Sequence, residues 1–128
     1  MGEMDDIYDK VSSFERYPRL NNILSDVKMN KKIKFESDGN VVSADKIIDS
    51  MKKNGIKPKF KVRDSIVYVV SEGLERFEFW ISKENYTNLR EIKSLKENNK
   101  NNLVGVTATI TRINKDDASN TSFRVEPA

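Results

Sequence analysis

The segment from Lys57 to Ile81 is the densest apolar stretch of the chain, and most of its side chains alternate as β-strands require. In Lys59 to Arg63, basic and apolar residues take turns. In Arg76 to Ile81, three apolar residues alternate with Arg76, Glu78 and Trp80. Between these two runs, Ile66 to Val70 is apolar at every position, which is typical of a central strand covered on both faces. The segment therefore predicts a three-stranded meander, around which we expect the rest of the chain to be arranged.

Two registers fit this meander, and they turn opposite faces of the middle strand toward the core, because a slip of one residue inverts a strand. With turns at Asp64-Ser65 and at Glu72 to Leu74, the core side chains are Val67 and Val69. With turns at Arg63 to Ser65 and at Gly73-Leu74, which suits a type II′ turn, they are Ile66, Tyr68 and Val70. Both registers place the same set on one face: Lys59, Lys61, Arg76, Glu78 and Trp80.

Helices are predicted on both sides of the meander. Apolar residues at helical spacing within residues 4–14 and 20–27 predict two short helices or one kinked helix, with a break at Pro18. Because both carry an apolar face, we expect residues 5–27 to belong to the fold. Ser43 suits the N-cap of a helix that stops at Asn54-Gly55. Ser82 suits the N-cap of another, whose apolar stripe begins at Tyr86.

The remaining segments predict further strands. Lys31 to Ser37 alternates, with Lys32 and Lys34 on its polar side, and is expected at an edge of the sheet. Val41-Val42 is expected to pair briefly, and Leu103 to Ile113 and Thr121 to Glu126 supply the last strands. The order ααβαβββαββ predicts an α+β domain with a mainly antiparallel sheet and helices packed against it. A barrel is the alternative to an open sheet, because two of the last strands could close against the first.

Length and composition limit the organisation and the chemistry. A single domain over residues 1–128 is expected, since this length can bury a core without disulfides or metals. The chain has no cysteine and no histidine, which excludes thiol and imidazole catalysis and zinc-finger ligation. There is also no phosphate-binding glycine loop and no serine nucleophile elbow. We therefore expect no cofactor and no metal, and a protein without enzymatic activity is favoured.

The same sequence argues against a membrane location. No apolar run approaches the roughly 18 residues that span a bilayer, and the acidic start of the chain is unlike a secretory signal. A cytoplasmic protein is expected.

Charge is distributed unevenly along the chain. Lysine and arginine number 23 against 20 acidic residues, a net charge of +3. Residues 1–27 have a net charge of −3, residues 28–63 of +7 and residues 64–128 of −1. A basic surface is thus expected from the middle of the chain, and an acidic one from its first helices.

Five residues are predicted to form a binding face: Lys59, Lys61, Arg63, Arg76 and Trp80. Cations beside an exposed aromatic ring can hold phosphates while a base stacks on the ring. The sequence therefore predicts a non-catalytic module that binds single-stranded nucleic acid. The competing structural interpretation is that the charges are merely solvated and Trp80 packs beneath the N-terminal helix. Lys32 and Lys34 are among several lysines that could enlarge the basic surface.

The alternative function is a protein-protein interaction or structural subunit. The acidic N-terminal helices or the Trp80 face would then dock onto a protein partner or a second copy of the chain as a homodimer. Asn114, Asp116 and Asp117 supply oxygen ligands, but their spacing does not match a calcium-binding loop, so a hydrophilic turn is expected. Three carboxylates near the hairpin turn are expected to be surface decoration: Glu72, Glu75 and Glu78.

Overall fold

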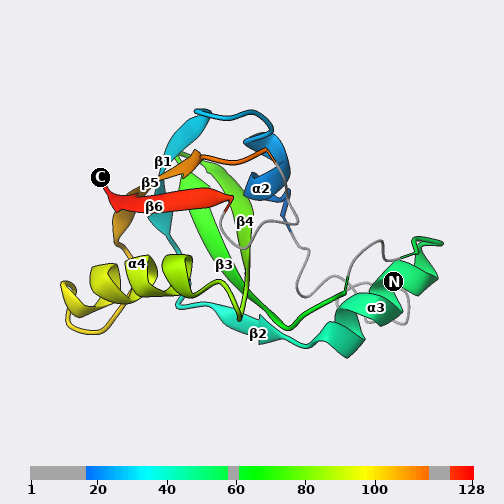
Figure 1. Ribbon diagram of the computed structural model, residues 1–128. Helices are drawn as coiled ribbons and strands as arrows, with labels where there is room; N and C mark the ends of the chain where they lie inside the picture. The colour runs from blue at the N-terminus through cyan, green and yellow to red at the C-terminus, as the bar shows by residue number, and fades with distance from the viewer. Residues whose placement is uncertain (1–16, 58–60, 116–121) are drawn as a thin grey trace.

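A computed structural model describes residues 17–57, 61–115 and 122–128 of the chain. In this part of the chain the elements are α2 (Leu20–Ile23), β1 (Asn30–Phe35), β2 (Asn40–Val42), α3 (Ala44–Lys53), β3 (Ser65–Glu72), β4 (Glu75–Ser82), α4 (Tyr86–Glu97), β5 (Thr107–Arg112) and β6 (Phe123–Pro127). The strands form one sheet with antiparallel ladders, and helices pack against it (Figure 1). The predicted α+β class is confirmed. The helix predicted within residues 4–14 lies outside the described residues.

β3 organises the sheet, because both of its edges are hydrogen-bonded. One edge pairs with β4 from Ser65 opposite Ser82 to Glu72 opposite Glu75. The other edge is shared, since β2 pairs with residues 65–67 and β1 with residues 70–71. β5 then pairs with β1, and β6 with β5. The prediction of an edge position for Lys31 to Ser37 is wrong, because β1 lies between β3 and β5.

Residues 30–42 act as one strand that bends at a bulge between β1 and β2. Phe35 pairs with Val70 and Asn40 with Val67, so the bent strand carries two more residues than β3 over this interval. Gly39 lies in the bulge with a φ of +97°. A Cβ atom at Gly39 would lie 2.7 Å from Cε1 of Tyr68. Glycine is required here both for its backbone conformation and for its lack of a side chain.

The turn between β3 and β4 decides which of the two registers is adopted. Because Glu72 pairs with Glu75, the loop is Gly73-Leu74. Gly73 has a φ of +61°, as the first position of a type II′ turn requires. The register that turns Ile66, Tyr68 and Val70 toward the core is confirmed, and the register with Val67 and Val69 there is wrong.

The predicted strand from Lys59 to Arg63 is wrong in the part that the structure describes. Lys61 to Asp64 has no strand conformation, and Lys59 lies outside the described residues. With Val42 paired to Ser65 and β4 on the opposite side, no edge of β3 remains for another strand. The segment is held in another way, since the Asp64 carboxylate accepts a 2.8 Å hydrogen bond from the backbone of Ala44.

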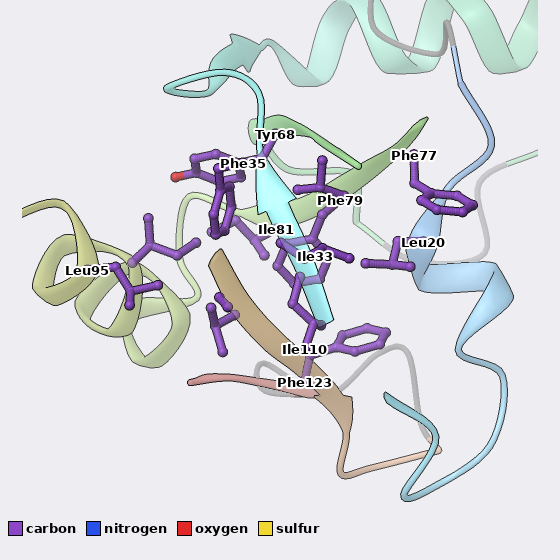
Figure 2. Close-up of a cluster of buried hydrophobic side chains, with 14 of the residues drawn as sticks. Leu20, Ile33, Phe35, Tyr68, Phe77, Phe79, Ile81, Leu95, Ile110 and Phe123 are labelled. Carbon is purple, nitrogen blue, oxygen red and sulfur yellow. The ribbon is translucent and has the colours of Figure 1, made fainter. Parts of the chain in front are cut away.

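The main core lies between the curved sheet, α2 and α4, and every strand except β2 contributes to it (Figure 2). Phe35 meets Tyr68 edge-on with ring centroids 5.7 Å apart, and Phe79 meets Phe123 in the same way at 5.6 Å. Such T-shaped pairs join β1 to β3 and β4 to β6 in a preferred aromatic geometry.

α4 is attached to β6 through buried asparagines. Its N-cap is Asn85 and not the predicted Ser82, because Oδ1 of Asn85 accepts a hydrogen bond from the backbone of Asn88. Asn88 is fully buried and donates to the carbonyl of Phe123 at 2.9 Å. Asn88, Ile92 and Leu95 share the buried helix face. Tyr86 lies off this face and is 70% exposed, so its predicted place on the apolar stripe is wrong.

The bulge makes a prediction about Gly39. Gly39→Ala should lower the free energy of unfolding by roughly 2 to 4 kcal/mol, because the new methyl group meets Tyr68 and Ile66 and the φ is unfavourable. Gly73→Ala is the matched control, since it has a positive φ but open space around it, and should lose only about 1 kcal/mol. Urea unfolding of both variants measures the difference. Equal losses would contradict a crowded bulge.

Tyr68 predicts a loss of stability at high pH. Burial, with a smaller contribution from Asp38, raises the pKa of Tyr68 from 10.0 to about 12. The unfolded chain therefore loses this proton first, so the contribution is intact below pH 10 and is lost between about pH 10 and pH 12. Two pKa units correspond to about 2.7 kcal/mol. Tyr68→Phe should flatten this part of the pH profile in denaturant titrations, whereas Tyr86→Phe, at an exposed position, should leave it unchanged.

Candidate binding face of the sheet

The side chains of β1, β3, β4 and β5 that point away from the core form the outer face of the sheet. The strand registers place Arg76 beside Ser71, Ser71 beside Lys34, and Lys34 beside Thr107. This makes one row across four strands, with neighbours about 5 Å apart. In the next row, Lys32 lies beside Thr109. We call these six residues the basic end of the outer face.

The cations of the basic end are accessible. Lys32, Lys34 and Arg76 are exposed, and among the described residues neither lysine forms an ion pair. Nη1 of Arg76 lies 3.4 Å from the Tyr17 hydroxyl, and this hydrogen bond raises the pKa of Arg76 above its ordinary value. Ser71 donates to the Glu36 carboxylate at 2.6 Å. Three positive charges and two threonine hydroxyls therefore lie together on this face, with two carboxylates at their border: Glu36 beside Ser71 and the exposed Glu126 of β6 beside Thr109.

The opposite end of the outer face is apolar and covered. Trp80 packs with Val42 and Val67 of the sheet, and Ile47 of α3 packs against them. The Arg19 guanidinium lies 3.9 Å from the centre of the Trp80 ring, and the indole nitrogen donates to Glu78 at 3.1 Å. Only 8% of Trp80 is exposed. The exposed ring that the stacking hypothesis requires is therefore not present at this position.

A short stretch of chain before and within α2 covers the second edge of β4. The backbone of Glu78 donates to the carbonyl of Pro18 at 2.9 Å. Asn21 donates to the carbonyl of Trp80 at 2.8 Å and accepts from its N–H at 2.9 Å. Arg112 of β5 also donates to the carbonyls of Asn21 and Leu24. Residues 17–24 thereby link β4 to β5.

The predicted binding residues are not brought together as a set. Arg76 and Trp80 do lie on one face of β4, as predicted, but Trp80 is covered. Lys61 and Arg63 are exposed in the segment between α3 and β3, where Arg63 forms an ion pair with Glu84. Lys59 lies outside the described residues.

Lys32 and Lys34 lie on the strand beside β3, in the position that the sequence pattern predicted for Lys59 and Lys61. Their alternation within Lys31 to Ser37 predicted that they share a strand face, and this is confirmed. The alternation did not predict which strand lies beside Lys34, because its partner Ser71 is far away in the sequence.

Few groups on this face suit catalysis or metal binding. Within the described residues, no cluster of three or more acidic side chains could hold a metal ion. Asp116 and Asp117 lie outside those residues. Glu72 is exposed and pairs with Lys31 at 2.8 Å, and Glu75 is exposed. Glu78 is 2% exposed, so its assignment to surface decoration is wrong, because the indole of Trp80 and the Pro18 segment cover it.

Comparison with known protein families, with curated proteins and with solved structures finds no match to this chain. In the part of the chain that the structure describes, no helix is both long and apolar enough to cross a membrane.

Asn21 provides a test of how Trp80 is covered. Asn21→Ala removes two hydrogen bonds to the Trp80 backbone and should lower the free energy of unfolding by about 1 to 3 kcal/mol. It should also shift tryptophan emission to the red and raise quenching by acrylamide. Asn22→Ala, the exposed neighbour, is the matched control and should change stability by less than about 0.5 kcal/mol. An unchanged spectrum in both variants would mean that residues 17–24 do not shield the indole.

Proposed function

We propose that the protein is a non-catalytic module that binds single-stranded nucleic acid through the basic end of its outer face. One observation carries this proposal: the registers align the exposed cations Lys32, Lys34 and Arg76 with two threonine hydroxyls in adjacent rows. Lysine, arginine and hydroxyl side chains are the groups that proteins use most to contact phosphate. The two rows lie about 7 Å apart along the strands, so a flexible backbone can contact both.

Tyr17 is the aromatic side chain that this proposal uses for stacking. It is half-buried, and its hydroxyl lies beside Arg76 at the end of the row. A ring next to cations on a sheet is the usual arrangement for binding a single strand without sequence preference. Trp80 has no direct role in this proposal, because its ring is covered.

The order of the strands supports the choice of this face. A bent first strand, a hairpin of β3 and β4, a helix, and then β5 beside β1 and β6 beside β5 is the connectivity of an OB-fold. OB-folds bind oligonucleotides on the second and third strands, which correspond here to β3 and β4. Of the basic end, only Ser71 and Arg76 lie on these two strands, whereas both lysines and both threonines lie on β1 and β5. Since one fold serves many functions, this likeness supports a part of the face and not the ligand.

A protein partner is the second candidate, and an exposed apolar patch favours it. Val27, Met29 and Ile113 are 46%, 40% and 43% exposed. Hydrogen bonds between the backbones of residues 28–29 and Arg112 bring these side chains to one end of β1 and β5. A patch of this kind suits a weak protein contact or self-association.

Binding of a fluorescent oligothymidylate, followed by anisotropy at about 50 mM salt where phosphate contacts are strong, tests the first candidate. Lys32→Ala, Lys34→Ala and Arg76→Ala should each weaken binding several-fold. Each should also reduce the slope of log affinity against log salt by about 0.7, the value for one phosphate on a single strand. Lys93→Ala, on the exposed side of α4, removes the same charge elsewhere and should change neither quantity.

The aromatic contribution is tested separately. Tyr17→Ala should weaken binding by about 1 to 3 kcal/mol if the ring stacks on a base, whereas Tyr17→Phe should retain most of the affinity. No binding at low salt, or equal effects of Lys93→Ala and Lys34→Ala, would contradict the proposal. Concentration-dependent sedimentation that Met29→Asp abolishes would then support the protein-partner candidate.

A further inference from the structure

The second row of the outer face continues past the basic end onto β6. Lys32 of β1 lies beside Thr109 of β5, and Thr109 lies beside Glu126 of β6. Lys32 and Glu126 are exposed, whereas Thr109 is half-buried. Two strand spacings separate the lysine from the glutamate, about 10 Å between their Cα atoms. A cation and a carboxylate therefore lie on either side of one threonine hydroxyl.

The Glu126 carboxylate forms neither an ion pair nor a hydrogen bond with the residues that the structure describes. Arg124, two residues earlier on β6, forms an ion pair with Glu91 at 2.8 Å. The hydrogen bond and charge of Glu91, with a smaller contribution from Glu126, raise the pKa of Arg124 above its ordinary value. Glu36, the other carboxylate at the border, accepts a hydrogen bond from Ser71. Glu126 is thus the border carboxylate whose two oxygens are both open to a ligand.

A carboxylate at this position affects the two kinds of nucleic acid differently. It accepts hydrogen bonds and cannot donate them, and its charge repels a phosphate held by Lys32. A DNA strand has no 2′-hydroxyl, so Glu126 would only weaken its binding. An RNA strand carries a 2′-hydroxyl on every sugar, and this hydroxyl can donate. With RNA, the carboxylate gains a charge-assisted hydrogen bond that offsets the repulsion.

We infer that the single strand bound by the protein is RNA, and that Glu126 accepts a hydrogen bond from a 2′-hydroxyl while Lys32 holds the neighbouring phosphate. The Thr109 hydroxyl lies between the two side chains and can donate to the phosphate or to the sugar oxygen. This inference rests on the proposed function, because it names the class of nucleic acid that binds at the basic end. It also adds Glu126 to the residues that contact the ligand.

Three fluorescent oligouridylates of equal length test the inference by anisotropy with the full chain at about 50 mM salt. Their sugars are ribose, deoxyribose and 2′-O-methylribose, and their bases are identical. The wild-type protein should bind the ribose form about three- to ten-fold more tightly than the deoxyribose form, the range expected for one hydrogen bond. The 2′-O-methyl form keeps the oxygen but has no proton to donate, so it should lose this advantage.

Glu126→Ala tests whether this carboxylate causes the preference. Without the negative charge, the affinity for the deoxyribose form should rise about two-fold. The affinity for the ribose form should fall, so the ratio of the two affinities should approach one. Glu126→Gln keeps an acceptor oxygen and should retain part of the preference. Glu97→Ala, at an exposed position on α4, removes the same charge elsewhere and should leave the ratio unchanged.

The possible failures of the inference and of the proposed function are distinguishable. Equal binding of the ribose and deoxyribose forms, a preference shared by the 2′-O-methyl form, or a preference that Glu126→Ala leaves unchanged would overturn the inference and leave the proposed function in place. If the wild-type protein bound none of the three strands, the proposed function and the inference would both be wrong. Urea unfolding of each variant confirms that it is folded.

Discussion

The sheet depends on β3 being hydrogen-bonded on both edges. β4 occupies one edge completely, and the bent strand formed by β1 and β2 occupies the other. At the bulge, where the ladder is interrupted, the hydroxyl of Ser37 accepts the hydrogen bond of Val69 N–H and the carbonyl of Val69 accepts from Glu36. Because no backbone group of Val69 is left without a partner, the first strand can bend without the cost of a buried unsatisfied amide. The bend therefore lets β1 contribute side chains to the main core while β2 contributes to the apolar cluster around Trp80 on the outer face.

Local chemistry predicted the local part of this arrangement. Alternation within Arg76 to Ile81 identified the two faces of β4, and Gly73-Leu74 was one of two turns that the sequence left open and is the turn that the structure adopts. The same alternation at Lys59 to Arg63 predicted a strand that the structure does not have. An alternating sequence indicates which side chains would share a face of a strand, but it does not indicate whether a neighbouring strand has an unpaired edge to bind it. The partner of β3 is β1, more than thirty residues earlier in the chain. Long-range pairing of this kind depends on the packing of the whole core, which no short window contains.

Trp80 shows the same division between local and distant information. Its place on the face opposite Phe79 followed from a period of two residues. Its burial did not, because the covering groups are Arg19 and Ile47, which approach from before β1 and from the connection between β2 and β3. A large aromatic ring on an outer face can either stack on a ligand or be buried beneath another element of the chain. The 8% exposure of Trp80 and the Arg19 guanidinium over its ring identify it as the second case.

The two ends of the outer face differ in what they can offer a ligand. At the Trp80 end, apolar contact is already satisfied by α3 and by residues 17–24. At the basic end, charge and hydroxyls are open to water, so attraction of an anionic group there would be long-range and salt-sensitive. Residues 17–22 touch both regions, because Tyr17 meets Arg76 while Arg19 and Asn22 line a groove beside α3. A ligand that moves Tyr17 therefore acts on the same short segment that closes the edge of β4 and borders the groove.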